Sequence, residues 1–386
     1  MKVLIVHNIL WAHYKAAVFQ ALHARSASAN VQIKVLQIAR NERSRAGWET
    51  TAAHAPVYRY DYELLFDRFV EEVSVGERTR ALLSRMRQFR PDVLYLTGYY
   101  DPAQLALLAY AKLTGVPVVM QMESTAADHG RGGPKEALKR AILRLCDGFF
   151  CFGSLQAEYL MQLGVTARKI LLRKTAVDND VLLRVFNEIC PNRSAKLTQM
   201  GLPSRNFVFV GRLIEPKNLP ALLNAFAQAR RQVDDRSWGL VFLGDGPLQA
   251  ALEQQAQNLG ITGQVRFLPA APWYEVPQTL ALADVLVLPS RSEPWGLVVN
   301  EAMVCGMPVL VSNRCGCVGD LVRDGENGFL FDPDQSDQLT GLMVKLMQLS
   351  DADRARMGAI SEEMIKPWSV GAVADEMLAG FLRLGH

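Results

Sequence analysis

Two glutamates lie eight positions apart in the stretch SRSEPWGLVVNEAM, which begins at residue 290. Glu293 precedes a Pro-Trp-Gly turn, and Glu301 lies about one turn into the helix that we expect to begin near Leu297. The free N–H groups at a helix start favour an anion, and carboxylates accept hydrogen bonds from hydroxyl groups. Gly296 would let a ligand approach the backbone closely. The stretch therefore predicts a site for an anionic ligand that carries hydroxyl groups.

Two cations lie in an earlier turn of the chain. The stretch FVFVGRLIEPKNLPALL predicts a buried strand that ends at Gly211, a loop with Arg212 and Lys217, and then a helix. A forked guanidinium and a compact ammonium together suit a diphosphate. One ligand could thus place a hexose at Glu293, a diphosphate at the helix start and the two cations, and a ribose diol at Glu301. The alternative is a pair of ordinary surface cations.

The elements that would position these residues alternate between apolar strands and periodic helical segments. Continuous Val, Ile and Leu runs predict strands buried on both faces, hence parallel sheets with helices on both sides. The pattern restarts at residue 206. We therefore expect an α/β protein with two Rossmann-like, doubly wound domains that face a central cleft. The expected boundaries are 1–180 for the first domain, 181–205 for a linker, 206–366 for the second domain, and 367–386 for a C-terminal helix.

Composition and charge narrow the functional classes. Of 386 residues, 49% are apolar, which is enough for buried cores. No run reaches 18 apolar residues, so we expect no membrane span, and the apolar N-terminus is expected to be a strand rather than a signal peptide. The first half is basic and the second half acidic. No basic module interleaved with aromatic residues is present, which disfavours nucleic acid as a partner.

Basic residues concentrate in the stretch RGGPKEALKRAILR, where Lys135, Lys139 and Arg140 can share one face of a helix. One interpretation is an ordinary solvated helix face. The other is a surface that meets anionic lipid headgroups or a phosphate-bearing substrate.

Several common fingerprints are missing from the sequence. Neither GxGxxG nor the GK[ST] of a P-loop occurs, which disfavours dehydrogenases and kinases. Asp178 and Asp180 have the D-x-D spacing of a metal site, but they fall in the segment between the domains, where a structural role is the better interpretation. We therefore expect no metal ion and no cofactor.

The second half resembles the retaining glycosyltransferases of family four, which have the GT-B fold. Four motifs between about residues 206 and 333 carry the resemblance: FVGRL…EPKNL, FLGDGP, ADVLVLPSRSEPWGLVVNEAMVCGMPVLVSN and GDLVRDGENGFLFDP. The resemblance implies that Arg212 and Lys217 bind the donor phosphates, that Glu293 holds the transferred sugar and that Glu301 holds the ribose. It further implies that three residues offer backbone N–H groups to the phosphates, namely Gly296, Leu297 and Val298. The GT-B fold also implies that the C-terminal helix, 367–386, returns to the first domain.

The first half resembles the family less closely. Where many members have a glycine-rich loop after the first strand, this chain reads HNILWAHYK, so His13, Tyr14 and Lys15 become the candidates for the acceptor side of the cleft. Where many members carry a catalytic histidine after the fifth strand, this chain reads MQMESTAADHGR. Glu123 is the candidate for that catalytic place, and His129 and Arg131 are further cleft candidates.

These observations predict a metal-independent, retaining hexosyltransferase. We expect it to use a UDP- or GDP-linked sugar as substrate and to act on a saccharide or a lipid-linked glycan in the synthesis of cell-surface polysaccharide. Two alternatives stay open, a catalytically silent subunit that binds nucleotide sugars and a GT-B epimerase. We expect a cytoplasmic location, and peripheral contact with the anionic inner face of the membrane through the basic first domain is a further hypothesis.

Overall fold

The computed structural model describes residues 1–43, 58–127, 133–233 and 237–385. The chain divides into two compact units. The first unit contains Met1–Val177 together with Trp368–His386, and the second contains Asp178–Pro367. The residues expected to form a linker, 181–205, fold mainly as helices and belong to the second unit.

The first unit is built on a parallel sheet with the strand order β3-β2-β1-β4-β5-β6-β7. Its strands are β1 (Lys2–Ile9), β2 (Gln32–Asn41), β3 (Tyr62–Phe69), β4 (Val93–Leu96), β5 (Val118–Met122), β6 (Gly148–Cys151) and β7 (Ile170–Arg173). Its helices are α1 (His13–Ser26), α2 (Val75–Phe89), α3 (Pro102–Leu113), α4 (Pro134–Arg144), α5 (Ser154–Gln162) and α15 (Val370–Leu382).

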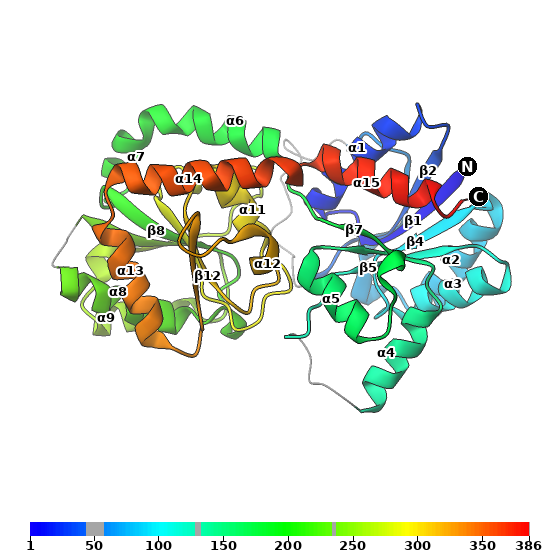
Figure 1. Cartoon of the computed structure of the whole chain (residues 1–386), viewed down its shortest axis with the longest axis horizontal. Helices are drawn as coiled ribbons and strands as arrows, with labels where there is room; N and C mark the ends of the chain where they lie inside the picture. Colours follow the sequence, from blue (N-terminus) through cyan, green and yellow to red (C-terminus); the bar gives the residue numbers. More distant parts are fainter. Residues whose placement is uncertain (44–57, 128–132, 234–236, 386) are drawn as a thin grey trace. The chain divides into compact units, whose positions relative to one another are not determined.

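Helices cover both faces of this sheet because successive strand residues point to opposite sides. Val3 and Ile5 of β1 pack with α1 and α15 on one face. Leu4 and Val6 of the same strand pack with α2, α3 and α5 on the other. Figure 1 shows α15, the last helix of the chain, beside α1. The predicted return of the C-terminal helix to the first domain is therefore confirmed.

The second unit repeats this architecture with the order β10-β9-β8-β11-β12-β13, and all its strand pairs are parallel. Its strands are β8 (Arg205–Val210), β9 (Trp238–Leu243), β10 (Val265–Leu268), β11 (Val285–Leu288), β12 (Val309–Ser312) and β13 (Gly328–Phe331). Its helices are α6 (Asn179–Ile189), α7 (Arg193–Gln199), α8 (Leu219–Val233), α9 (Gln249–Asn258), α10 (Val276–Leu280), α11 (Leu297–Val304), α12 (Val318–Leu321), α13 (Ser336–Gln348) and α14 (Asp351–Ile365).

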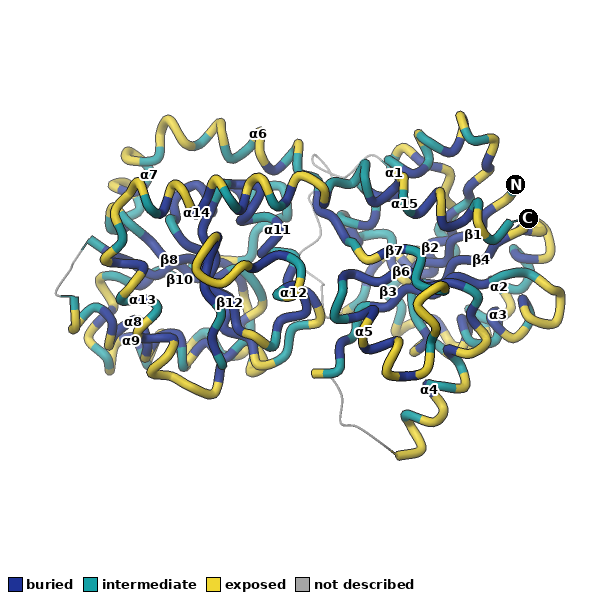
Figure 2. The backbone as a smooth tube through the Cα atoms, viewed as in Figure 1, coloured by how far each residue is buried: buried dark blue, intermediate teal, exposed yellow. Residues whose placement is uncertain are grey.

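The predicted fold class is confirmed, since each unit contains a doubly wound parallel sheet. The central strands form a buried layer in each unit, whereas the edge strand β3 has no buried residue and α6 and α9 expose much of their length (Figure 2). In sheets of this order the strand order reverses between β1 and β4, and again between β8 and β11. Ligands of doubly wound proteins bind outside the carboxyl ends of the strands at such a reversal.

Candidate active site

The loop after β8 carries Arg212 and Lys217 and is held by the neighbouring turn. The backbone N–H of Leu213 donates to the carbonyl of Asp245 at 2.9 Å. Gly244 has a φ of +145°, and a Cβ on it would lie 2.0 Å from the carbonyl oxygen of Gly211. The stretch GDGP therefore has a structural role, because its glycines allow this turn and the loop after β8 to pack backbone against backbone.

The second loop, after β11, carries Glu293 and ends where α11 begins. Gly296 precedes α11 with a φ of +97°, and a Cβ there would lie 2.8 Å from Cδ2 of Leu288. The indole Nε1 of Trp295 donates to Oδ1 of Asn300 at 2.8 Å in a buried contact. Glycine is needed at position 296 because the positive φ disfavours other residues and because Leu288 leaves no space for a Cβ.

The two loops are joined by side-chain and backbone contacts. The ammonium of Lys217 pairs with the carboxylate of Glu293, and both side chains are largely buried, with 16% and 14% of their surface exposed. The backbone N–H of Arg291 donates to the carbonyl of Pro216 at 2.8 Å. A lysine after one strand and a glutamate after another, 76 positions later, thus form one charged centre beside the reversal of strand order.

Sequence reasoning missed the support that this centre receives from the loop after β12. Glu293 forms an isolated β-bridge with Cys315. Gly316 donates its N–H to the carbonyl of Glu293 at 2.9 Å, and Cys317 donates to the carbonyl of Trp295 at 3.2 Å. Only the position of Cys-Gly-Cys directly after a predicted strand pointed to this role, because backbone hydrogen bonds do not depend on side-chain type.

Glu301 and the start of α11 complete the candidate donor region. Burial raises the pKa of the Glu301 carboxyl from 4.5 to about 8, because desolvation disfavours the charged form. The first N–H groups of a helix lack acceptors within the helix, so those of Leu297 and Val298 are available to an anion. Arg212 is exposed on its loop. All of the candidate donor residues therefore belong to the second unit and follow strands β8 and β11.

The candidate residues of the first unit differ in their burial and in their contacts. His13 begins α1, and Tyr14 is partly buried. Lys15 is not a surface cation: it is 8% exposed and its Nζ donates to Oε1 of Gln121 at 2.5 Å. Glu123 lies just after β5 and accepts from Nε2 of Gln121. The remaining two candidates, His129 and Arg131, lie outside the described residues.

Two further sequence interpretations can be compared with the structure. Asp178 caps α6, because its side chain accepts a hydrogen bond from the backbone N–H of Val181 at 3.2 Å, which accounts for one aspartate of the D-x-D pair. The prediction that Lys135, Lys139 and Arg140 form a basic surface of α4 is wrong. Lys139 is buried and donates to the hydroxyl of Tyr159 at 3.1 Å, and Arg140 pairs with Glu136 at 2.6 Å. Lys139 lies on the face of α4 that packs against the rest of the first unit.

Comparison with known proteins identifies the family. Residues 200–364 match the profile described as glycosyl transferases group 1, and residues 12–173 match the glycosyl transferase 4-like domain. The chain belongs to the group 1 glycosyltransferases. The resemblance expected from the sequence is therefore confirmed. Each of the two profiles matches residues within one of the two units.

Individual relatives of this glycosyltransferase differ in how much they share with it. A GDP-mannose-dependent phosphatidylinositol monomannoside mannosyltransferase of Mycolicibacterium smegmatis is 33% identical over 174 residues, which cover 43% of this chain and 44% of the relative. A D-inositol 3-phosphate glycosyltransferase of Streptosporangium roseum is 28% identical and covers 77% of this chain and 73% of the relative. The match thus spans less than half the length of the first relative.

Solved structures support the fold of the whole chain. HepE of Anabaena, in complex with UDP and glucose, superposes with a TM-score of 0.75 at 17% identity, covering 99% of this chain and all of HepE. A glycosyltransferase of Rickettsia africae gives a TM-score of 0.77 at 11% identity, covering 99% of this chain and 98% of that one. At these identities the likeness establishes the GT-B fold of this glycosyltransferase. Among the described residues, no helix has the length and apolar character of a membrane span.

Proposed function

We propose that the chain transfers a hexosyl group from a UDP- or GDP-linked sugar to an acceptor hydroxyl, with retention at the anomeric carbon. The observation that carries this proposal is the Lys217–Glu293 pair beside the start of α11. In it a cation suited to phosphate and a carboxylate suited to sugar hydroxyls lie side by side. Family membership supports glycosyl transfer, and relatives named for GDP-mannose and a fold neighbour holding UDP support a nucleotide donor.

Each residue has a role in this proposal. Cleavage of the donor builds negative charge on the leaving diphosphate. Arg212, Lys217 and the N–H groups of Leu297 and Val298 stabilise that charge, and one such donor can lower the barrier by about 3–4 kcal/mol. Glu293 accepts hydrogen bonds from the hexose and Glu301 from the ribose. These fixed groups supply the electrostatic stabilisation that a divalent metal gives in other transferases, so the reaction is proposed to be metal-independent.

The two units divide the substrates in this proposal. The second domain, 206–366, binds the donor, and the first domain, 1–180, binds the acceptor, with Glu123 contacting a hydroxyl of the bound saccharide. The acceptor hydroxyl attacks the face of the sugar from which the diphosphate departs, and its proton passes to the leaving phosphate. The acceptor class is a saccharide or a lipid-linked glycan used for cell-surface polysaccharide.

A peripheral membrane role would come from the outer face of α4. The exposed residues of α4 and its C-cap include Leu138 and Leu145, by 62% and 44%, and the charged Lys135 and Arg144. Apolar side chains beside cations suit the surface of an anionic bilayer. Co-sedimentation with vesicles of neutral or anionic lipid tests this, and equal binding to both would remove the electrostatic part of the proposal. Glutamate at both Lys135 and Arg144 should abolish the preference for anionic vesicles.

The central test is a calorimetric screen of UDP-, GDP- and dTDP-sugars. We expect one nucleotide class to bind, Lys217→Met to weaken that binding at least tenfold, and Glu293→Gln to remove discrimination between sugars more than affinity for the nucleotide. Lys366→Met is the matched control, since this exposed lysine lies in the same unit and pairs with Glu363. The anomeric configuration of the product, read by NMR, tests retention.

The outcomes separate the alternatives. Binding without transfer to any saccharide acceptor would favour a silent nucleotide-sugar subunit. A donor sugar recovered with an inverted ring carbon would favour an epimerase. Failure of every nucleotide sugar to bind would overturn the proposed function.

A further inference from the structure

The reversal of strand order in the first sheet carries a buried polar network. Lys15 lies in the first turn of α1, after β1, and Tyr95 lies in β4 on the other side of the reversal. Gln121 belongs to the next strand, β5, and Glu123 follows it. All four therefore come from elements at the edge of the sheet where a doubly wound domain binds its ligand.

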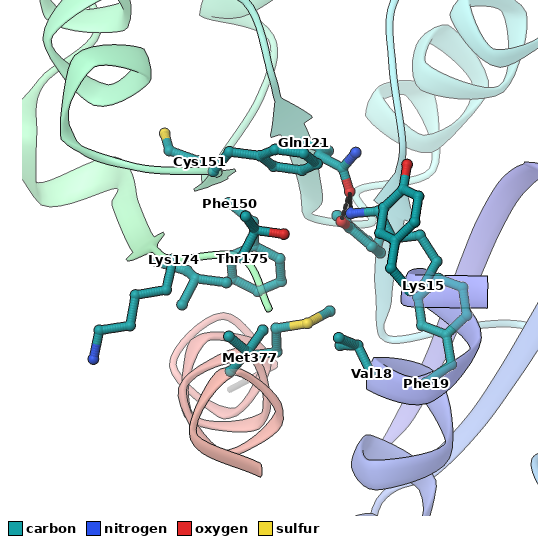
Figure 3. Close-up of a pocket in the computed structure, with 14 residues that line it drawn as sticks. Lys15, Val18, Phe19, Gln121, Phe150, Cys151, Lys174, Thr175 and Met377 are labelled. Carbon is teal, nitrogen blue, oxygen red and sulfur yellow. Dashed lines mark hydrogen bonds between the residues drawn. The ribbon is translucent and has the colours of Figure 1, made fainter. Parts of the chain in front are cut away.

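Gln121 is the centre of this network. The ammonium of Lys15 and the hydroxyl of Tyr95 both donate to its Oε1, each at 2.5 Å, and its Nε2 donates to the carboxylate of Glu123. An amide oxygen has two lone pairs, and both are engaged here. Turning the amide over would place its NH₂ against two donors, so the network fixes the direction in which Gln121 points. Figure 3 shows Lys15 and Gln121 directed toward each other.

Burial of the charged Lys15 side chain is energetically unfavourable. Desolvation lowers its pKa from 10.5 to about 8, and the negative charge of Glu123 partly opposes that shift. The ammonium lies 4.5 Å from the centre of the Phe152 ring, a distance at which a cation is attracted to the ring. A methionine of similar length would fill the same space without the cost of burying a charge.

Among the described groups around Lys15, Glu123 supplies a negative charge that acts on its ammonium. Lys15 and Gln121 are among the residues that line a cavity of about 20 Å³, which has room for about one water molecule. Tyr95 and Cys151 stay neutral because burial raises the pKa of each, and the centre of the Tyr14 ring lies 5.6 Å from the ammonium of Lys15. Lys174, from the end of β7, pairs with Glu376 of α15 at 2.7 Å. The other residues that α15 contributes to the cavity are apolar, Val373 and Met377.

We propose that Lys15 is a positioning residue on the acceptor side, which holds Glu123 through Gln121 so that its carboxylate meets a hydroxyl of the bound saccharide. The inference rests on the proposed function, which places the acceptor in the first domain. It differs from the expectation that Lys15 itself contacts substrate, since a side chain 8% exposed reaches the ligand only through its neighbours. No bond forms or breaks at Lys15.

Lys15→Met gives the kinetic test. We expect kcat/KM for the acceptor to fall about 10–100-fold, as for a lost hydrogen bond to a charged group, with the KM of the donor unchanged within twofold. The wild-type rate should decline as pH rises through about 8, where Lys15 loses its charge. Lys15→Met should lack that decline. Tyr95→Phe removes the other donor to Gln121 without a change of charge, and should lower the same kinetic constant while keeping the pH dependence.

Lys174→Met is the matched control. It lines the same cavity, but its side chain points away from Gln121 in Figure 3, and it should keep both the rate and the pH profile. A purely structural role for Lys15 would change thermal stability and leave the acceptor constant and the pH profile alone. A Lys15→Met enzyme with the wild-type profile would overturn the inference.

A second measurement does not depend on turnover. In protein labelled with ¹³C-lysine, the Cε resonance of Lys15 should titrate near pH 8, and Glu123→Gln should move that midpoint to lower pH because an opposing charge is lost. An unmoved midpoint would show that the two residues are not coupled and would end the inference. Wild-type protein that binds no nucleotide sugar would instead contradict the proposed function, so the two failures are distinguishable.

Discussion

The buried carboxyl group of Glu301 contributes a pH dependence to the stability of the folded chain. Its pKa in the folded chain is about 8, raised by burial from 4.5. The folded protein therefore holds a proton that the unfolded chain has already released between these two values, and stability falls as pH rises through that window. Glu301→Gln has no such group. Its melting temperature should match wild type near pH 5 and exceed it near pH 8. Parallel curves from pH 5 to 8 would refute this.

The same carboxyl predicts a proton released on donor binding. If ribose hydroxyls donate to Glu301, they favour its charged form and lower its pKa. Near pH 7 the binding of a nucleotide sugar should then expel a fraction of a proton. Calorimetry in buffers of different ionisation enthalpy measures it, and Glu301→Gln should bind without release. Equal proton release by the variant would place the effect elsewhere.

At this scale the sequence predicted residues better than it predicted their partners. Lys217 and Glu293 could be placed because each follows a recognisable buried strand, but their ion pair could not, since 76 positions separate them. The sequence makes Lys15 a candidate for contact with the acceptor, but its burial could not be predicted because its hydrogen-bond acceptor, Gln121, lies 106 positions away. Burial of a charge depends on such distant partners, and no local pattern encodes them.

The start of α11 is the element on which the donor region depends. Gly296→Ala would put a Cβ at a φ of +97° and 2.8 Å from Leu288. We expect the free energy of unfolding to fall by about 1–3 kcal/mol. The binding free energy of the donor should fall by a larger fraction of its wild-type value, because the helix start would shift. Chemical denaturation and calorimetry measure the two effects.

Gly263→Ala is the control for that prediction. It lies in the same unit, has an ordinary φ, and a Cβ there would meet no atom within 4 Å. Its donor affinity should equal that of wild type. Donor affinity that survived in Gly296→Ala would mean that the start of α11 does not bind the phosphates.

Predicting elements from sequence failed where packing rather than pattern decides. Buried strands such as β9 and β11 were found because they are continuously apolar. The edge strand β3 was missed, since none of its residues is buried and its sequence, YELLFDRF, lacks a clean alternation. The sequence predicts a linker at 181–205, whereas Asp178 caps α6 and Leu182 of this helix is buried. An N-cap followed by apolar residues at helical spacing was the available signal.

At the scale of the whole molecule, the first unit is completed by the end of the chain. Phe381 of α15 is fully buried, with its ring 5.2 Å from Phe150 and 6.0 Å from Tyr95. These strand residues face away from α2 and α3, so α15 and α1 together cover that side of the sheet. The sequence could predict this return only as part of the family resemblance, because the helix follows directly on the second unit.

Phe381→Ala should therefore destabilise the first unit by about 3–5 kcal/mol, the usual cost of a large cavity in a core. Hydrogen exchange should show loss of protection in β1, β4 and α1, and the acceptor reaction should fail first on warming. Donor binding by the second unit should persist, because none of its candidate residues lies in the first unit. Ala379→Ser, on the exposed side of the same helix, should change neither property. Equal loss of protection in both units would show that they unfold as one cooperative body.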